Sequence, residues 1–454
     1  MMITIIGNSV AAIGAIEAIR KVDKKIPITV ISKEPYVAYG RPVISDFLKG
    51  KAKEEKVLSY RRKDFYDKHN IKLILNEEVV DIDTKKKKVI TLSGNEYKYT
   101  KLLIATGGVP FIPPFKGRDL KNVYTFTTLD DAKKLLSLSK DIKKAVVIGG
   151  GLIGLKAAEG LHAQGVKVSI VELMDRILSL AFDKVSGSIV ENRMSDMGID
   201  IYTEASTEEI LDDGNGSVRG IRLKGGREIE GDIVVIAIGV APNASFAKKA
   251  GIEVNRGIIV NDHMETNIKD IYAAGDVAEA KQFLYEQKML LPIWPDAYKQ
   301  GRVAGYNMIG VQRVYEGGLA MNSIELFGVS TISAGAHTPQ NPEGYEFLVD
   351  VDEKRYRYRK ITLKDNKLVG FIFVGDIDRA GIFVGLIRDK VDVTPFKDKL
   401  LKKDFGFIDL PYDLRQEKFW KKFLEVKDAS CIEEVCPKYT PDYVESDSEV
   451  IDGE

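Results

Sequence analysis

The segment from Lys144 to Glu172 constrains the fold more than any other stretch of the chain, with the sequence KAVVIGGGLIGLKAAEGLHAQGVKVSIVE. The apolar run AVVIG is typical of a buried parallel strand. Apolar residues at helical spacing then cover 152–164, and a second apolar run at 166–171 ends on Glu172. A strand, a glycine turn, a helix and a second strand in this order predict a Rossmann βαβ unit.

Three glycines form the turn after the first strand and satisfy the GxGxxG pattern. Gly149 permits a tight turn, Gly151 lets the backbone approach a pyrophosphate, and Gly154 lets helix and strand pack closely. The diphosphate of a dinucleotide would lie at the helix N-terminus, where free N–H groups favour negative charge. Glu172 stands where a Rossmann unit holds the adenosine ribose diol. The expected contacts are Gly149, Gly151, Leu152, Ile153, Gly154 and Glu172.

The bulk properties exclude several classes of protein. The chain has 454 residues, enough for about three domains. Its 67 basic residues balance 67 acidic ones, so no global field attracts nucleic acid. Only two cysteines are present, both near the C-terminus, which argues against a disulfide-stapled secreted protein. No apolar run approaches the roughly 18 residues of a membrane span, and the start lacks signal-peptide features. We therefore expect a soluble cytoplasmic protein.

The first 34 residues repeat the Rossmann pattern in weaker form. ITIIG precedes the turn Gly7-Asn8-Ser9-Val10-Ala11-Ala12, where serine and alanine stand in for the later glycines. A helix through Arg20 and the strand ITVIS are expected to follow. Strand-end counting places the ribose-binding group near Ser32, but the available acid is Glu34. Serine and alanine can replace the later glycines if the backbone still comes close enough to a phosphate.

Each unit has a later apolar strand that ends in small residues and glycine. LLIATGG (102–108) follows the first glycine turn, and VVIAIGV (234–240) follows the second. The first nucleotide domain is therefore predicted to be interrupted by a second domain built on the same plan. The residues at these strand ends are Ala105, Thr106, Gly107 and Gly239.

A third segment, TNIKDIYAAGDVAE (266–279), is predicted to be a strand that ends in Gly275-Asp276 and leads into a helix. Its carboxylate would accept hydrogen bonds from a polyol chain, or would merely cap that helix. Residues 291–310 are predicted to form a helix whose first turn follows Pro295 and leaves free N–H groups near Ala297.

The motifs follow one another as G-x-S-x-x-A, YxRP (39–42), LLIATG, GGGLIG with its glutamate, AIGVAPN and IYAAGDV. In this order they resemble the FAD/NAD(P)-dependent pyridine nucleotide-disulfide oxidoreductase superfamily. Within it, the chain is similar to NADH:rubredoxin or ferredoxin reductases, NADH oxidase-like proteins and the flavin part of nitrite reductases. The resemblance covers about residues 1–395. It implies an α/β fold with two nested Rossmann-like domains, for FAD and NAD, and a C-terminal α+β interface domain.

The resemblance also implies domain bounds and cofactor contacts. FAD binding is expected of residues 1–118 with 244–320, NAD(P)H binding of 119–243, and an interface role of 321–403, with 404–454 as an extension. Asp276 would hold the ribitol of FAD, Val80 would meet the adenine through its backbone, and the 291–310 helix would face the polar edge of the flavin. NADH is favoured over NADPH because Glu172 would repel a 2′-phosphate. The residues implied around the ADP half of FAD are Gly7, Ser9, Val10, Ala11 and Glu34. Thr106 and Gly107 would line the pyrophosphate side, and Arg41 and Pro42 would lie near the flavin. Further expected cofactor contacts are Ala105, Gly275 and Ala297.

Two departures from the superfamily narrow the reaction. Disulfide reductases carry CxxxxC, and coenzyme A-disulfide reductases and NADH peroxidases carry one cysteine near the segment 39–42, but this chain has no cysteine before position 431. Electrons must therefore leave the flavin directly, to a protein centre, a quinone-like acceptor or dioxygen. Lys156 stands where many relatives have glutamate. It is either a catalytic cation near the flavin or nicotinamide, or a solvated surface lysine.

The four histidines are scattered through the sequence, so neither a metal site nor a general base is expected of them. Hydride transfer between nicotinamide and flavin needs little acid–base help, because the cofactor carries the chemistry. The histidines are His69, His162, His263 and His337.

From about Met321 the pattern changes to antiparallel strands separated by turns, followed by a helix at 380–390. In the tail, Cys431 and Cys436 could form a disulfide, supply two metal ligands, act as a shuttle arm or remain inert thiols. The acidic end, ESDSEVIDGE, is expected to be disordered. The tail is a candidate docking element for a partner.

The leading hypothesis is an FAD-dependent NADH:acceptor oxidoreductase. Electrons would pass to or from ferredoxin, rubredoxin or another iron–sulfur redox protein. The alternatives are an NADH oxidase that reduces dioxygen, and a non-catalytic or electron-conduit subunit of a larger redox complex. A homodimer or membership of such a complex is expected; the sequence does not name the acceptor or the direction of electron flow.

Overall fold

The computed structural model describes residues 1–58 and 60–416. The chain divides into two compact units, Met1–Val391 and a second that begins at Asp392. The two cysteines and the acidic end of the tail lie outside the described residues. Every helix within the described ranges falls short of the length and apolar character that a membrane span requires.

The first parallel sheet is built from short apolar strands that are mostly buried, as expected for a sheet covered on both faces, and its edge strand β3 is the most exposed. Its strand order is β19-β7-β1-β2-β3, and all neighbours run parallel. The last of its strands in chain order is β19, which follows all five strands of the second sheet in the sequence. The strands are β1 (Ile3–Ile6), β2 (Ile28–Ile31), β3 (Ile71–Ile74), β7 (Lys101–Ile104) and β19 (Ile271–Ala273).

The second parallel sheet has the order β12-β11-β10-β16-β9. Together the two sheets confirm the predicted pair of nested Rossmann domains. The strands are β9 (Val123–Tyr124), β10 (Lys144–Ile148), β11 (Lys167–Val171), β12 (Asp200–Tyr202) and β16 (Ile233–Ile236). The helices of this region are α5 (Leu129–Leu138), α6 (Leu152–Ala163) and α7 (Lys184–Asp196).

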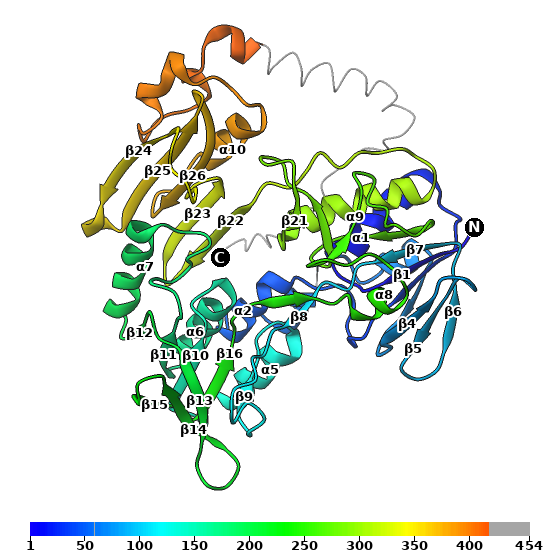
Figure 1. Ribbon diagram of the computed structural model, residues 1–454, viewed down its shortest axis with the longest axis horizontal. Coiled ribbons are helices and arrows are strands. Elements are labelled where there is room, and N and C mark those ends of the chain that lie inside the picture. Colours follow the sequence, from blue (N-terminus) through cyan, green and yellow to red (C-terminus); the bar gives the residue numbers. More distant parts are fainter. Residues whose placement is uncertain (59, 417–454) are drawn as a thin grey trace, which may run out of the picture. The chain divides into compact units, whose positions relative to one another are not determined.

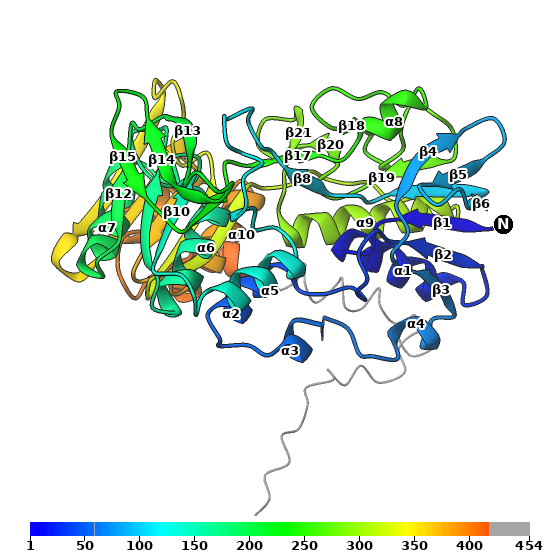
Figure 2. The same cartoon turned by 90° about the horizontal axis from the view of Figure 1, so that it is seen from below.

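Helices α1 (Val10–Val22) and α9 (Trp294–Met308) lie against each other although they are far apart in sequence (Figures 1 and 2). Glycines make this close approach possible. A Cβ at Gly301 would lie 2.0 Å from the carbonyl oxygen of Ala11, and one at Gly305 would lie 2.6 Å from that of Ala15. The C-terminal half of the first nucleotide domain is therefore fixed onto its first helix by backbone contact.

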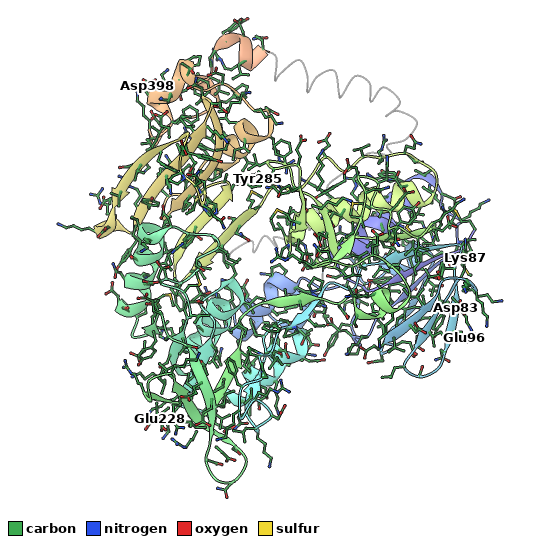
Figure 3. All side chains as sticks on the ribbon, viewed as in Figure 1. Asp83, Lys87, Glu96, Glu228, Tyr285 and Asp398 are labelled. Carbon is green, nitrogen blue, oxygen red and sulfur yellow. The ribbon has the colours of Figure 1, made fainter. Side chains whose placement is uncertain are left out.

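Two small antiparallel sheets, one mixed three-stranded sheet of order β18-β20-β21 and a two-stranded ribbon flank the Rossmann sheets. Figure 3 shows Asp83, Lys87 and Glu96 on the one formed by β4, β5 and β6. The strands are β4 (Val79–Asp83), β5 (Lys88–Thr91), β6 (Glu96–Lys98), β8 (Gly108–Pro110), β13 (Thr207–Asp212), β14 (Val218–Leu223), β15 (Glu228–Glu230), β17 (Val240–Pro242), β18 (Ile258–Ile259), β20 (Ala278–Lys281) and β21 (Lys288–Leu290). The remaining short helices are α2 (Ile44–Leu48), α3 (Glu54–Leu58), α4 (Phe65–Lys68) and α8 (Ser245–Lys249).

The prediction of a helix directly after Asp276 was wrong, because β20 follows instead. This strand pairs with β18 and β21. Its buried Glu279 accepts hydrogen bonds from Asn255 Nδ2 and from the N–H groups of Arg256 and Gly257 at 3.0–3.1 Å. Tertiary pairing thus overrides the helical preference of an Ala-Glu-Ala-Lys run.

The C-terminal part of the first unit is a five-stranded antiparallel sheet of order β22-β23-β26-β25-β24. Helix α10 (Ala380–Arg388) packs on it through Phe383, whose ring lies 4.9 Å from that of Phe373 and 5.7 Å from that of Phe371. This confirms the predicted α+β domain. The strands are β22 (Met321–Leu326), β23 (Val329–Gly335), β24 (Tyr345–Asp352), β25 (Arg357–Lys364) and β26 (Lys367–Val374).

Candidate functional site

A cavity of about 2080 Å³ lies in the first unit. Sites for one small molecule usually measure about 300–1,000 Å³, so this space is large enough for more than one ligand. Its wall includes the turns after β1 and β10, the residues after β7 and β16, and the first turn of α9. Both predicted nucleotide segments therefore open into the same space.

The turn after β1 leaves the N-terminus of α1 open to the cavity. Gly7 has a φ of 103°, and a Cβ there would lie 2.2 Å from the carbonyl oxygen of Ala105, so only glycine fits. Ser9 is the N-cap residue, but its side chain makes no capping hydrogen bond, and the first turn carries no acidic residue. The N–H groups of this turn are available to an anion such as a pyrophosphate.

Glu34 lies on the cavity wall and is held by side chains of the following loop. The Tyr39 hydroxyl donates to Glu34 Oε2 at 2.6 Å, and Arg41 forms an ion pair with Glu34 Oε1. Arg41 also donates to the carbonyl oxygen of Thr127 at 3.0 Å. The acid and the arginine predicted for the first site thus form one hydrogen-bonded group.

Asp276 lines the cavity at the end of the segment that follows β19. Within residues 1–58 and 60–416 its carboxylate has no hydrogen-bond partner. Burial raises the pKa of Asp276 to about 6; Arg41 opposes this rise and Asp296 adds to it. A carboxylate in this condition gains from donors that a ligand brings, such as hydroxyl groups.

The glycine turn after β10 is shaped in the same way as the turn after β1. Gly149 has a φ of 112°, and its Cβ would lie 2.4 Å from the carbonyl oxygen of Ala237. A Cβ at Gly154 would lie 2.0 Å from the carbonyl oxygen of Gly149, which explains the close packing of helix and strand. A Cβ at Gly151 would meet no atom within 4 Å, although this residue lines the cavity. The space beside Gly151 is therefore left open by the fold.

Glu172 is held by the backbone of its own unit. Its Oε2 accepts from Gly150 N–H at 2.6 Å, and its Oε1 accepts from Met174 N–H at 2.7 Å. The cavity wall beside it is apolar and open to solvent. Its exposed side chains are Leu173, Met174, Leu180 and Ile238, with exposed fractions of 67%, 49%, 95% and 37%.

Lys156 belongs to a buried cluster of charges and is not a solvated surface lysine. Its Nζ donates to Glu159 Oε2 and to the carbonyl oxygen of Glu325, both at 2.8 Å. Lys49 Nζ lies 2.6 Å from the same Glu159 oxygen. The side chains of Lys49, Glu159 and Lys156 are 4%, 9% and 18% exposed. Burial lowers the pKa of Lys156, and Lys49 lowers it further, while Glu159 opposes both effects.

Most of the predicted residues line the cavity. Val80 and Gly154 do not. Val79 lies on the wall in place of Val80, and Gly154 packs against the backbone of the turn at Gly149. The predicted residues on the wall are Gly7, Ser9, Val10, Ala11, Glu34, Arg41, Pro42, Ala105, Thr106, Gly107, Gly149, Gly151, Leu152, Ile153, Lys156, Glu172, Gly239, Gly275, Asp276 and Ala297.

Several other wall residues could not be predicted from the sequence. Lys49 follows the short helix α2, and Asn322, Ser323 and Glu325 belong to β22 of the C-terminal sheet. These residues belong to no motif, and only the tertiary arrangement brings them to the cavity. Among the described residues, no group of three or more His, Cys, Asp and Glu side chains is placed to hold a metal ion.

Comparison with known families identifies both parts of the first unit. Residues 1–301 match the family described as "Pyridine nucleotide-disulphide oxidoreductase". Residues 321–391 match the "Rubredoxin NAD+ reductase C-terminal domain". The two matches cover the Rossmann domains and the antiparallel sheet, respectively.

Individual relatives agree with these families. The chain is 36% identical over 394 residues to nitrite reductase [NAD(P)H] of Bacillus subtilis, covering 86% of this chain but only 48% of that protein. It is 34% identical over 400 residues to the NADH-dependent phenylglyoxylate dehydrogenase subunit epsilon of Aromatoleum evansii, covering 87% of this chain and 94% of that subunit. The crystal structure of NADH:rubredoxin oxidoreductase from Clostridium acetobutylicum is similar with a TM-score of 0.72 at 31% identity, covering 87% and 97% of the two chains.

These families imply FAD and NAD(P)H, and the residues of the cavity fit both. Two open helix N-termini, at α1 and α6, offer separate anion sites. The open space at Gly151 leaves room for a pyrophosphate. Asp276, whose carboxylate has no hydrogen-bond partner in the described part of the chain, offers an acceptor for a hydroxyl-rich chain.

Proposed function

Since the chain belongs to the pyridine nucleotide-disulphide oxidoreductase family of NAD(P)H-dependent flavin oxidoreductases, we propose that it is an FAD-dependent NADH:acceptor oxidoreductase. It would exchange electrons with an iron–sulfur redox protein such as ferredoxin or rubredoxin. The observation that supports this proposal is that both predicted nucleotide segments line the same cavity, whose wall contains no cysteine.

We assign FAD to residues 1–118 with 244–320 and NADH to 119–243. The FAD pyrophosphate would lie at the N-terminus of α1, and Asp276 would accept hydrogen bonds from the ribityl hydroxyls. The first turn of α9 would present its N–H groups to the polar edge of the ring system. When bound, FAD supplies the acceptor for a hydride from the nicotinamide and the donor for the onward electrons.

Glu172 supports NADH as the preferred coenzyme. Its carboxylate is fixed by two backbone N–H groups and would accept from a ribose 2′-OH, but it would repel a 2′-phosphate. Among the described wall residues, the segments 171–181 and 205–207 contribute no lysine or arginine that could bind such a phosphate.

The lack of cysteine determines how electrons would leave. The wall segment 39–46 presents Tyr39, Arg41, Pro42, Ile44, Ser45 and Asp46 to the cavity. None of these side chains can form a disulfide or a sulfenate, so a thiol relay has no place there. Direct transfer to a redox protein, or to dioxygen, is what this wall permits.

A second candidate function is that of an electron-entry subunit in a larger redox complex. The relative named as a subunit of phenylglyoxylate dehydrogenase is matched over 94% of its length, whereas the nitrite reductase is matched over about half. In this case the protein would still oxidise NADH, and its acceptor would be a neighbouring subunit.

One experiment separates these functions. The purified protein is titrated anaerobically with NADH and with NADPH while the flavin absorbance is followed, and then mixed with ferredoxin, rubredoxin or air. We expect bleaching by NADH, followed by reoxidation by a protein acceptor much faster than by dioxygen. Faster reoxidation by dioxygen would contradict the proposal and leave an NADH oxidase. Slow reoxidation by every free acceptor, together with rapid reduction of dyes, would favour the subunit.

A further inference from the structure

A buried polar cluster lies behind the part of the cavity wall that α9 forms. It consists of Asp296, Gln300 and Tyr315, which are 5%, 1% and 3% exposed, and we call it the Asp296 cluster. The Tyr315 hydroxyl donates to Asp296 Oδ2 at 2.6 Å, and Gln300 Nε2 donates to the same oxygen at 3.1 Å. Gly318 closes the cluster, because a Cβ there would lie 2.6 Å from Asp296 Oδ2.

The cluster is connected to the cavity through the amide of Gln300. A carboxylate only accepts hydrogen bonds, so Asp296 fixes which end of this amide faces it. The oxygen, Gln300 Oε1, is thereby turned towards Gly275 and accepts from its N–H at 2.8 Å. Gly275 has a φ of 83° and precedes Asp276, which lines the cavity. Asp296 thus orients the turn that presents the Asp276 carboxylate.

The position of Asp296 also gives its charge an electrostatic role. It lies in the first turn of α9, while Ile293, Trp294 and Ala297 of the same region form the cavity wall. Asp296 Oδ2 accepts hydrogen bonds from both Tyr315 and Gln300, and these two donors favour the ionised form. Burial raises the pKa of Asp296, and this is opposed by the Tyr315 and Gln300 donors and by the charges of Lys299 and Arg388.

A buried carboxylate is costly, and an apolar side chain of similar size would often be as stable. None of the steps assigned to the cavity needs a proton from Asp296. A fixed negative charge behind a helix N-terminus does, however, weaken the stabilisation that this terminus offers to added electron density.

We propose that Asp296 is a positioning residue that lowers the reduction potential of the bound flavin. It acts through its charge behind the first turn of α9 and through Gln300, which aligns Gly275 and Asp276. This inference rests on the proposed placement of FAD. It predicts that the ratio of NADH to NAD⁺ needed to half-reduce the flavin is higher than it would be without the carboxylate.

The test is the flavin midpoint potential of the Asp296→Asn holoenzyme, measured against a reference dye with a chemical reductant. Asn keeps an acceptor for Tyr315 but removes the charge. We expect a more positive potential, equal to roughly a tenfold lower NADH:NAD⁺ ratio at half-reduction, which is about 30 mV for a two-electron couple. An unchanged potential at full FAD occupancy would overturn the proposal and leave a structural role.

Asp183→Asn is the matched control. Asp183 also accepts from a tyrosine hydroxyl, that of Tyr358 at 2.7 Å, and it is not on the cavity wall. Its neutralisation should lower the melting temperature and leave the flavin potential unchanged. An equal shift in both variants would overturn the proposal, because it would show a general effect of lost charge.

Tyr315→Phe tests the proposal if Asp296→Asn does not fold. Removal of the hydroxyl takes one donor from the carboxylate and favours its protonation. The potential should therefore shift in the same direction by a smaller amount, and the difference from wild type should grow as the pH falls. Lys299, Arg388 and Asp276 are the other charged groups that act on Asp296, and they remain in place in this variant. A potential that matches wild type at every pH would contradict the proposal.

The dye measurement needs neither NADH nor an acceptor, so its failure is separate from a failure of the proposed function. A wild-type flavin that NADH cannot reduce would refute the function while the shift in Asp296→Asn still held. A normal NADH reaction with no shift in either variant would refute only the role of Asp296.

Discussion

The two Rossmann segments share one motif but differ in what surrounds them. The first is enclosed, since α9 packs against α1 through Gly301 and Gly305 and its phosphate turn lies beside buried Val10 and Ala11. The second is open, since the wall beside Glu172 carries Leu180 with 95% of its surface exposed. The same strand–turn–helix unit is therefore compatible with a ligand that is retained and with one that exchanges.

The acids of the two segments, Glu34 and Glu172, also differ in which groups hold them. Glu34 depends on side chains from a later loop, Tyr39 and Arg41, which must be in place before the site is complete. Glu172 depends only on backbone N–H groups of its own unit. Arg41 is in turn held by the carbonyl oxygen of Thr127, a distant residue of the chain. The first acid therefore depends on side chains that contact a distant segment, whereas the second is held by backbone N–H groups.

The largest expected effect comes from filling the open space at Gly151. Its backbone conformation is ordinary, and a Cβ would meet no protein atom within 4 Å, so Gly151→Leu should fold normally. The side chain would occupy the space assigned to a pyrophosphate and weaken NADH binding roughly a hundredfold, as a steric cost of about 3 kcal/mol implies. Anaerobic reduction by NADH would show the loss, while the FAD content should be unchanged.

Gly385→Ala in α10 is the control, because a Cβ there also meets no atom within 4 Å and the residue is not on the cavity wall. It should bind both cofactors normally. Loss of FAD together with NADH in Gly151→Leu would contradict the separate assignment of the two sites.

The second-largest effect is expected from replacing the two acids, Glu172 and Glu34, which should give different results. Glu172→Ala removes the charge that would repel a 2′-phosphate, so the ratio of kcat/KM for NADPH to that for NADH should rise roughly tenfold or more. Glu34→Ala should loosen FAD and leave this coenzyme ratio unchanged. Steady-state dye reduction with both coenzymes measures the ratio. A change of coenzyme preference in Glu34→Ala would show that the sites had been assigned in the wrong order.

Much of this architecture could be predicted from the sequence because Rossmann units are local. The apolar strands, the glycines at 149, 151 and 154 and the acid at 172 all follow from the spacing of one short segment. The nesting of the domains followed from the repeated pattern. The family matches confirm the resemblance, whereas the roles of individual residues remain predictions.

The remaining features depend on contacts between distant segments. The run after Asp276 has helical composition, but pairing with β18 and β21 makes it a strand. Gly301 and Gly305 lie inside the continuous helix α9, where glycine is unfavourable, and the reason for them becomes clear only when α1 is placed against them. Lys156 could not be interpreted without Lys49, which lies more than a hundred residues earlier on another helix end.

A smaller effect, on FAD alone, is expected from Asp276. Its pKa of about 6 lies above the ordinary value of 3.8, so ionisation costs the FAD-free protein stability. This cost is absent below pH 3.8 and is fully present above about 6. Hydroxyl donors from FAD would remove it. The rise in melting temperature on adding FAD should therefore be larger at about pH 8 than at about pH 5.

Asp276→Asn should bind FAD roughly tenfold more weakly at neutral pH, and its response to FAD should vary less with pH. Asn keeps the size of the side chain and one acceptor oxygen, so a large loss of stability is not expected. A wild-type response to FAD that is the same at both pH values would show that Asp276 does not accept from the ligand.

The smallest effect is expected from Lys156, because Glu159 is paired with Lys49 as well as with Lys156. In Lys156→Gln, Lys49 keeps its ion pair with Glu159 at 2.6 Å, and the cavity wall loses one positive charge without leaving a buried charge unpaired. Flavin reduction by NADH should slow only a few-fold, as removal of one partly screened charge implies. Glu159→Gln differs in kind: it takes the carboxylate from Lys156 and leaves Lys49 with its ion pair to Asp46 at 3.6 Å, so it should cost about 3 kcal/mol of stability. Stopped-flow reduction and thermal unfolding of both variants distinguish the roles. A rate loss above roughly a hundredfold in Lys156→Gln would instead place this lysine in contact with the reacting cofactors. The reaction at the second site would then depend on a residue outside its GxGxxG motif.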